Sequence, residues 1–104
     1  MKTIVPTSIR PARVADVTVF GKIINDCAEY GLMLHRSLAF LYEHVREFHV
    51  AEVEDTGQIS GVCGLRIVWA NIAEIYALAI APDHRGKGLG RQLVEASVQD
   101  ARRL

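Results

Sequence analysis

The chain has 104 residues, of which 50% are hydrophobic and 23% are charged. These values are typical of one globular domain with a modest core and argue against a disordered chain. Twelve basic and twelve acidic side chains cancel, so no overall charge would attract a nucleic acid or a membrane surface. The sequence shows no signal-peptide pattern and no apolar run near the roughly 18 residues of a membrane span. We therefore expect a cytoplasmic protein with neither nucleic-acid nor membrane partners.

The chain begins with a predicted strand and helix. Residues 7–13 favour a short strand, which Pro11 confines to a sheet edge or an early end. Asp16 is expected to cap the helix that follows, and Gly31 to end it. The apolar residues at helical spacing are Val17, Phe20, Ile24, Cys27 and Ala28.

A second, shorter helix is expected after Ser37, which can cap it. Its apolar side consists of Leu38, Leu41, Tyr42 and Val45. The loop between the two helices carries His35 and Arg36.

Three strands follow, because the apolar pattern changes from helical to extended. Residues 48–54 and 59–69 are separated by the turn residues DTGQ. Strict alternation in the second of these strands places six residues on one face: Ile59, Gly61, Cys63, Leu65, Ile67 and Trp69. Residues 72–80 are nearly continuously apolar, which predicts a central strand covered on both faces, and Pro82 ends it.

A final amphipathic helix closes the chain. Its apolar face consists of Leu89, Leu93, Val94, Ser97, Ala101 and Leu104. The predicted order is strand, helix, helix, three strands and helix, which indicates an α/β (α+β) fold.

Neither cysteines nor histidines predict a metal site. Cys27 and Cys63 lie far apart, and the closest histidines, His44 and His49, match neither ligands on one helical face nor a zinc signature. Widely separated cysteines are typical of reduced thiols. We expect both to pack in the core.

Residues 84–90, HRGKGLG, place three glycines at alternate positions between the last strand and the final helix. Glycine inside an element costs about 0.5–1 kcal/mol relative to alanine, so three together indicate a use. The N–H groups at a helix N-terminus form a phosphate site. The spacing fails the dinucleotide fingerprint and the nucleotide P-loop, but Arg85, Gly88 and Gly90 satisfy R-x-x-G-x-G. A flexible loop that merely contains glycines is the alternative.

The stretch AEIYALAIAPDHRGKGLGRQLVE resembles the acetyl-CoA-binding core of the GNAT superfamily of N-acetyltransferases. The resemblance covers the strand from residue 72, the turn and the final helix, and the order of elements upstream agrees with it. It implies a GNAT-like fold with a central mixed, mostly antiparallel sheet flanked by helices. It also implies acetyl-CoA as the cofactor and an N-acetyltransferase activity.

Two segments would hold the cofactor if the resemblance extends to it. In the superfamily the glycine turn wraps the pyrophosphate, which here implies Arg85, Gly86, Lys87, Gly88, Leu89, Gly90 and Arg91. The exposed backbone at the end of the preceding strand pairs with the pantetheine arm, which implies Leu78, Ala79 and Ile80. Pantetheine amides can imitate a strand edge. For Lys87 and Arg91, a solvated surface charge is an equally open alternative.

Acetyl transfer to an amine needs a proton acceptor and donors for the developing oxyanion, here backbone N–H groups near Leu78. Strict alternation puts Glu74 on the same apolar face as Tyr76 and Leu78, where desolvation would raise the pKa of its carboxyl. AEI also resembles the segment that carries a general-base glutamate in some superfamily members. We therefore expect Glu74 to be the base, with pairing to a basic side chain as the alternative. Tyr76 could orient the substrate, donate a proton, or simply pack in the core.

The stretch GLMLHRSLAFLYEHVREFHVAE lies where the superfamily builds its acceptor pocket, so the resemblance implies substrate binding by His35 and Arg36. Arg36 could clamp a carboxylate, although surface arginines are ordinarily solvated. With ANIAEI this stretch is similar to amino-acid acetyltransferases of the N-acetylglutamate synthase type, which act in arginine biosynthesis. The implied acceptor is a small amine or an amino acid such as glutamate, which attacks the thioester directly.

Superfamily members normally continue past this helix with further strands and another helix. We expect residues 1–104 to form a single acetyl-CoA-binding domain that lacks these C-terminal elements, with a sheet edge that a homodimer would complete. A non-catalytic CoA-binding or interaction module is the alternative function.

Overall fold

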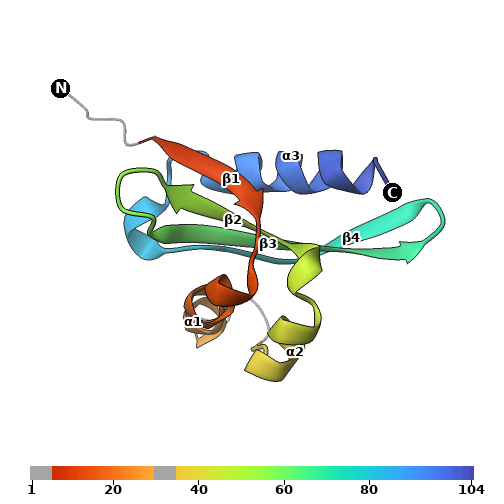
Figure 1. Cartoon of the computed structure of the whole chain (residues 1–104), viewed down its shortest axis with the longest axis horizontal. Coiled ribbons are helices and arrows are strands. Elements are labelled where there is room, and N and C mark those ends of the chain that lie inside the picture. The colour runs from red at the N-terminus through yellow and green to blue at the C-terminus, as the bar shows by residue number, and fades with distance from the viewer. Residues whose placement is uncertain (1–5, 30–34) are drawn as a thin grey trace.

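The computed structural model describes residues 6–29 and 35–104. Within them, a sheet in the order β1-β2-β3-β4 carries α3 on one face and α1 and α2 on the other (Figure 1). The strands are β1 (Thr7–Pro11), β2 (Phe48–Val53), β3 (Ile59–Trp69) and β4 (Ile72–Ile80). The helices are α1 (Val17–Glu29), α2 (Leu38–Glu43) and α3 (Leu89–Ala101), with short 3-10 turns η1 (Val14–Asp16), η2 (Val45–Glu47) and η3 (Pro82–His84). The predicted order of elements and the mostly antiparallel sheet are confirmed, and every strand pairing in the described ranges is antiparallel.

Two apolar clusters hold the layers together, one on each face of the sheet. On the α1 face, Phe20 stacks on Phe48 with ring centroids 5.0 Å apart, in a cluster that also contains Cys27. On the α3 face, Leu93 packs with Cys63. Burying a large apolar side chain contributes about 1.5–3 kcal/mol. Both cysteines are buried, as expected.

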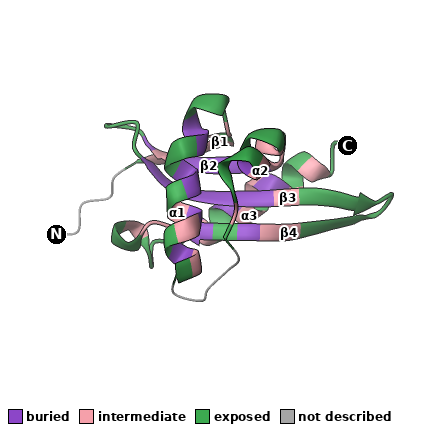
Figure 2. Ribbon diagram, turned by 90° about the horizontal axis from the view of Figure 1, so that it is seen from below, coloured by how far each residue is buried: buried purple, intermediate pink, exposed green. Residues whose placement is uncertain are grey.

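β4 lies at the edge of the described sheet, so the prediction of a central strand covered on both faces is wrong. It pairs with β3 alone, and Ile72 at its start is 56% exposed. Figure 2 shows the reason: the β3–β4 hairpin extends past the helices, and its far end is exposed. The continuous apolar run of residues 72–80 therefore belongs to an edge strand in a projecting hairpin and not to a central strand.

Register shifts break the strict alternation that the sequence suggests. Gly64 pairs with Ala77 but Leu65 pairs with Ile75, which leaves Tyr76 as an extra residue in β4. Such a bulge turns the residues on either side of it to opposite faces. Two other shifts lie between Ile67 and Trp69, and opposite Ala51 and Glu52 in β2. Because of the shift opposite Ala51 and Glu52, Ile59 packs in the α1-face cluster rather than with Cys63.

The start of α1 also differs from the prediction, because the chain enters the helix through η1. Asp16 does not cap α1. Instead its carboxylate accepts from the backbone N–H of Arg13 at 2.7 Å and from Arg10 at 2.8 and 3.0 Å. The predicted stop at Gly31 lies outside the described residues. Ser37 does cap α2, accepting from the backbone N–H of Phe40 at 3.1 Å.

No helix in the described ranges is both long enough and apolar enough to cross a membrane.

Candidate active site

The glycine turn connects β4 to α3 and leaves open space in front of the helix. Gly86 and Gly88 have φ values of 77° and 80°, a region that disfavours any residue with a Cβ. A Cβ built on either glycine would meet no atom within 4 Å. Gly88 is the N-cap of α3, and no side chain caps the helix. The first N–H groups of α3 therefore point into an unfilled space, where the helix dipole favours an anion.

Gly90 differs from the other two glycines of the turn. It lies in the first turn of α3 with an ordinary φ, and a Cβ there would lie 3.9 Å from the Leu78 side chain, an ordinary contact. A side chain at position 90 is therefore compatible with the fold. Such a side chain would instead interfere with a ligand bound in the space in front of the N-terminus of α3.

Arg85 turns back toward the protein. Its Nε donates to the carbonyl of Ile80 at 3.1 Å, and its Nη2 lies 3.5 Å from Cys27 Sγ. These contacts tie the turn to the end of β4 and to α1. Arg85 therefore holds the turn in shape, a role that the sequence pattern alone did not indicate.

The remaining side chains of the turn divide into one that is buried and two that are exposed. Leu89 is buried with Leu93, so only its backbone can meet a ligand. Lys87 is exposed, and Arg91 bonds Glu95 at 3.0 Å on an exposed helix face. Neither cation is fixed toward the turn.

The end of β4 adjoins the turn. Leu78 is 42% exposed, whereas Ala79 is buried and Ile80 is half-buried. Because β4 has a strand neighbour on one side only in the described sheet, alternate backbone groups of residues 78–80 face away from β3. This edge is open to an extended, amide-containing ligand.

Glu74 and Tyr76 face α1 and α2, whereas Leu78 and Ile80 face α3. The bulge at Tyr76 causes this difference, so the predicted common face for Glu74 and Leu78 is wrong. Glu74 accepts from Arg66 at 2.9 Å, and its side chain is 49% exposed. The expected apolar surroundings of Glu74 are therefore absent from the described structure, and the alternative of a basic partner is the one observed.

Tyr76 lies at the centre of this face. Its ring meets Phe40 and Phe48 edge-on, with centroid distances of 6.1 and 5.7 Å. Its hydroxyl donates to Glu47 Oε1. Burial, together with the bond to Glu47, raises the pKa of Tyr76, so this phenol stays neutral across physiological pH.

Arg36 is held beside Tyr76 through its backbone. Asn25 donates to the Arg36 carbonyl at 2.9 Å and accepts from its N–H at 2.8 Å. The guanidinium lies 5.1 and 5.4 Å from the ring centroids of Phe40 and Tyr76, and its Nε is buried without a hydrogen-bond partner in the described structure. Such a cation, stacked but not paired with an acid, is suited to a carboxylate.

His35 is exposed, and no hydrogen bond or ion pair within the described ranges joins it to Arg36 or Tyr76. Sequence reasoning missed three residues that shape this face: Asn25, Glu47 and Arg66. Arg66 could have been found from the hairpin register only if the bulges had been known. The sequence pattern did not indicate Asn25 or Glu47, because their hydrogen-bond partners, Arg36 and Tyr76, lie on other elements.

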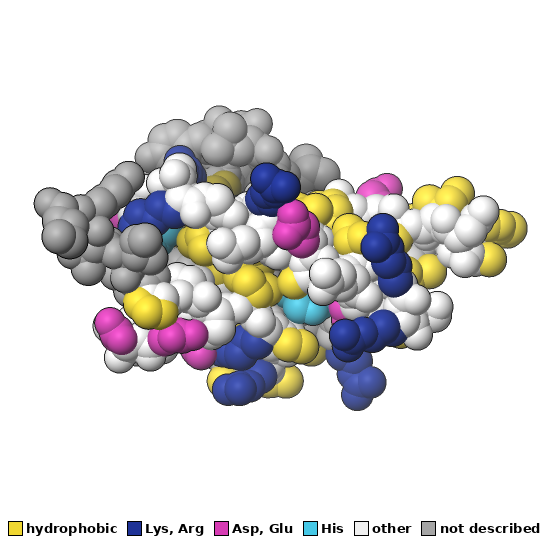
Figure 3. Space-filling model, turned by 90° about the horizontal axis from the view of Figure 1, so that it is seen from above, with side chains coloured by type: hydrophobic (Ala, Val, Ile, Leu, Met, Phe, Trp, Pro, Cys, Tyr) yellow, Lys and Arg dark blue, Asp and Glu magenta, His cyan; other side chains and the backbone are white. Residues whose placement is uncertain are grey.

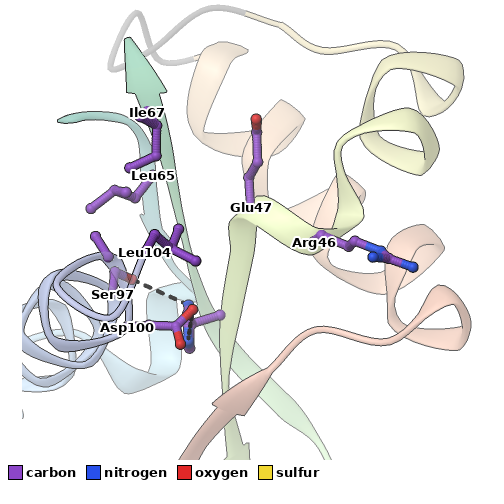
Figure 4. Close-up of a pocket in the computed structure, with 9 residues that line it drawn as sticks. Arg46, Glu47, Leu65, Ile67, Ser97, Asp100 and Leu104 are labelled. Carbon is purple, nitrogen blue, oxygen red and sulfur yellow. Dashed lines mark hydrogen bonds and ion pairs between the residues drawn. The ribbon is translucent and has the colours of Figure 1, made fainter. Parts of the chain in front are cut away.

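A separate cavity of about 300 Å³ lies on the α3 face, at the far end of that helix (Figure 4). Its lining includes Leu65, Leu104 and His49, and Ser97 Oγ lies 3.5 Å from His49 Nδ1. Ser97 donates to the Leu93 carbonyl at 2.8 Å, so its proton is engaged within the helix and it is not poised as a nucleophile. None of the predicted site residues lies there. Within the described structure, no cluster of at least three His, Cys, Asp or Glu residues could hold a metal ion.

Comparison with known proteins assigns the fold and the turn to one family. Residues 20–104 match the acetyltransferase (GNAT) family. The chain therefore belongs to this family, and the resemblance of its glycine turn is confirmed.

Its relatives include amino-acid acetyltransferases. The chain is 40% identical to an uncharacterized N-acetyltransferase of Chlorobaculum tepidum, covering 86% of this chain and 56% of the relative. It is 35% identical to the amino-acid acetyltransferase of Mycobacterium tuberculosis, covering 92% and 55%. N-acetylglutamate synthase of Neisseria gonorrhoeae, solved with coenzyme A and N-acetyl-glutamate, matches with a TM-score of 0.85 and 31% identity over 96% of this chain and 23% of that one. The chain thus spans just over half the length of the first two relatives.

Proposed function

We propose that this chain binds acetyl-CoA and serves as an N-acetyltransferase for a small amino acid, in the manner of its amino-acid acetyltransferase relatives. The observation that carries the proposal is the glycine turn: left-handed Gly86 and Gly88 stand before the uncapped N-terminus of α3, facing open space. A phosphate-bearing ligand fits such a turn.

The residues present fit the cofactor. The N–H groups of residues 86–90 would hold the pyrophosphate, and the exposed Lys87 would turn toward it, as would Arg91 on leaving Glu95. The backbone groups of the segment 78–80 (Leu78, Ala79 and Ile80) that face away from β3 would pair with the pantetheine amides, although the Ile80 carbonyl already accepts from Arg85. The synthase of Neisseria gonorrhoeae was solved with coenzyme A, which supports this assignment.

The acceptor would lie on the α1 and α2 face, between Arg36 and Glu74. Arg36 would bind a carboxylate of the acceptor, because its guanidinium is stacked on two rings and its Nε has no hydrogen-bond partner in the described structure. We propose that His35, which precedes Arg36 in the chain and is exposed, also binds the acceptor. An amino acid such as glutamate supplies both the amine and the carboxylate, and we place the reaction in cytoplasmic arginine biosynthesis by similarity to the synthase.

Bound acetyl-CoA supplies the acetyl group as a thioester, which the amine attacks directly. Glu74 would accept the proton of the amine through its exposed carboxylate. Arg66 orients that carboxylate through their 2.9 Å contact. The backbone N–H groups near Leu78 would stabilise the negative charge on the acetyl oxygen.

We also propose that residues 1–104 act as one acetyl-CoA-binding domain and that a second copy completes the sheet at the hairpin end of β4, outside the segment 78–80 proposed for pantetheine. Apolar side chains gather at the hairpin end of the α3 face (Figure 3). Ile67, Val68 and Trp69 are each about half exposed or more. Exposed apolar groups beside an edge strand favour pairing with another chain.

Calorimetric titration with acetyl-CoA tests the cofactor site. We expect saturable binding by the native chain and at least a ~10-fold loss of affinity for Gly90→Glu, because a carboxylate at the first turn of α3 repels the phosphates without straining the fold. Gln99→Glu, which adds the same charge at the exposed far end of α3, is the matched control. No binding by the folded native chain, or equal affinity for Gly90→Glu, would overturn the assignment.

A further inference from the structure

Glu47 and Tyr76 form a hydrogen-bonded pair that joins the turn before β2 to the bulge of β4. Tyr76 donates its hydroxyl proton to Glu47 Oε1. His44 Nδ1 lies 3.3 Å from the same carboxylate oxygen, and the imidazole stacks on Phe40 with centroids 4.2 Å apart. The carboxylate is thus held from two sides while its side chain stays 30% exposed.

The direction of the Tyr76 hydroxyl is fixed by the packing of its ring. Phe40 and Phe48 contact the ring edge-on. Arg36 and Arg66 place their guanidinium groups 5.4 and 5.2 Å from its centroid. A tyrosine held by four neighbours cannot swing its hydroxyl away from Glu47 without breaking several contacts.

This arrangement determines which hydrogen bonds the pair can offer a ligand. A phenol has one proton and two acceptor lone pairs. Since the Tyr76 hydroxyl donates its only hydrogen bond to Glu47, its oxygen can only accept further hydrogen bonds. The oxygens of the Glu47 carboxylate are also acceptors. A ligand group that meets this pair must therefore donate, and a cationic N–H donor forms the stronger bond.

We propose that Tyr76 is the acceptor group that binds the substrate ammonium and that Glu47 is its positioning residue. The inference rests on the proposed function and adds to it the recognition of the amine. Arg36, on the same ring, would then take the carboxylate, so that the face distinguishes an amino acid from a simple carboxylic acid. Tyr76 orients the substrate under this proposal and is not a general acid.

The test compares L-glutamate with glutarate, which lacks the amine, by calorimetric titration of the CoA-saturated chain. Tyr76→Phe removes the hydroxyl, and Glu47→Gln removes the charge that fixes it. We expect each variant to weaken glutamate binding by ~10-fold, as for the loss of one hydrogen bond to a charged group, and to leave glutarate binding unchanged. Tyr42→Phe and Glu43→Gln, at exposed positions of α2, are the matched controls.

Each outcome bears on the inference. An equal loss for glutamate and glutarate would show that the pair is merely structural, and unchanged affinity for both would show that it does not meet the amine. Absence of glutamate binding by the native chain would also overturn the inference. Retained binding of CoA in the same sample would leave the proposed cofactor site standing, so the two failures are distinguishable.

Discussion

Glu74 and Arg66 pair across the β3–β4 hairpin, with the carboxylate 2.9 Å from the guanidinium and each side chain about half exposed. An exposed pair of this kind contributes little to stability. Its value is to hold the Glu74 carboxylate in place on the face of Tyr76, where we propose that the acceptor amine binds.

Replacing Glu74 by Gln should remove the proposed base without disturbing the fold. We expect turnover to fall by about 10²-fold or more, the usual scale of general-base catalysis, with the affinity for acetyl-CoA preserved. Steady-state release of CoA thiol, paired with calorimetry, measures both quantities. Glu54→Gln, at the exposed turn after β2, is the control. A variant as fast as the native chain would remove Glu74 from the mechanism.

Tyr76 should ionise only at a pH above the ordinary tyrosine value. Its pKa is raised by burial and by Glu47, so the folded chain keeps a proton that the unfolded chain releases near a pH of about 10. Stability contributed by this phenol is present below that pH and is lost as the pH rises further. Absorbance titration at high pH should show a late tyrosine step that is missing from Tyr76→Phe. Disappearance of the same step from Tyr42→Phe would contradict the assignment.

The Arg10, Asp16 and Glu52 cluster should make the fold sensitive to acid. Arg10 bonds Asp16 at 2.8 Å and Glu52 at 3.0 Å, and its hydrogen bond is the main cause of the lowered pKa of Asp16. The stabilisation is present above the ordinary carboxyl pKa of about 3.9 and is lost as the pH falls below it. Asp16→Asn should cost about 1–3 kcal/mol in urea unfolding at neutral pH. That cost should shrink near pH 3, since Asp16 is then increasingly protonated in the native chain as well; an undiminished cost would refute the electrostatic explanation.

His49 should destabilise the fold at mildly acidic pH. Burial lowers its pKa, and Asp100 at 3.9 Å only partly opposes this. The unfolded chain therefore takes up a proton more readily than the folded chain, and stability falls as the pH drops through about 6.5. Nuclear magnetic resonance titration of the imidazole protons should show His49 titrating below the ordinary histidine pKa of about 6.5. Titration of His49 at or above that value would contradict this account.

The sequence pattern predicted the parts of the fold that depend on local chemistry. The spacing of Phe20 and Ile24 indicated which face of α1 is buried, and Ser37 indicated where α2 begins. The alternate glycines of residues 86–90 indicated the turn, because positive φ values restrict the residue type. Each of these features depends on neighbours within one turn of chain.

Features that depend on strand register were not predictable in the same way. The single extra residue at Tyr76 moves Glu74 to the opposite face from Leu78, and the residue types around it do not predict such a bulge. The partners of Tyr76 and Arg36, namely Glu47 and Asn25, belong to other elements and are brought close only by the packing. The candidate site was therefore predicted in its members at the turn and only in part on the acceptor face.

The measurement that tests the account most directly is mass spectrometry of the chain incubated with acetyl-CoA and a panel of amino acids. The account predicts an N-acetylated amino acid, glutamate foremost, formed in equal amount to free CoA and lost in Glu74→Gln. Binding of acetyl-CoA without acetylation of any amino acid in the panel would contradict it and would favour a non-catalytic CoA-binding module.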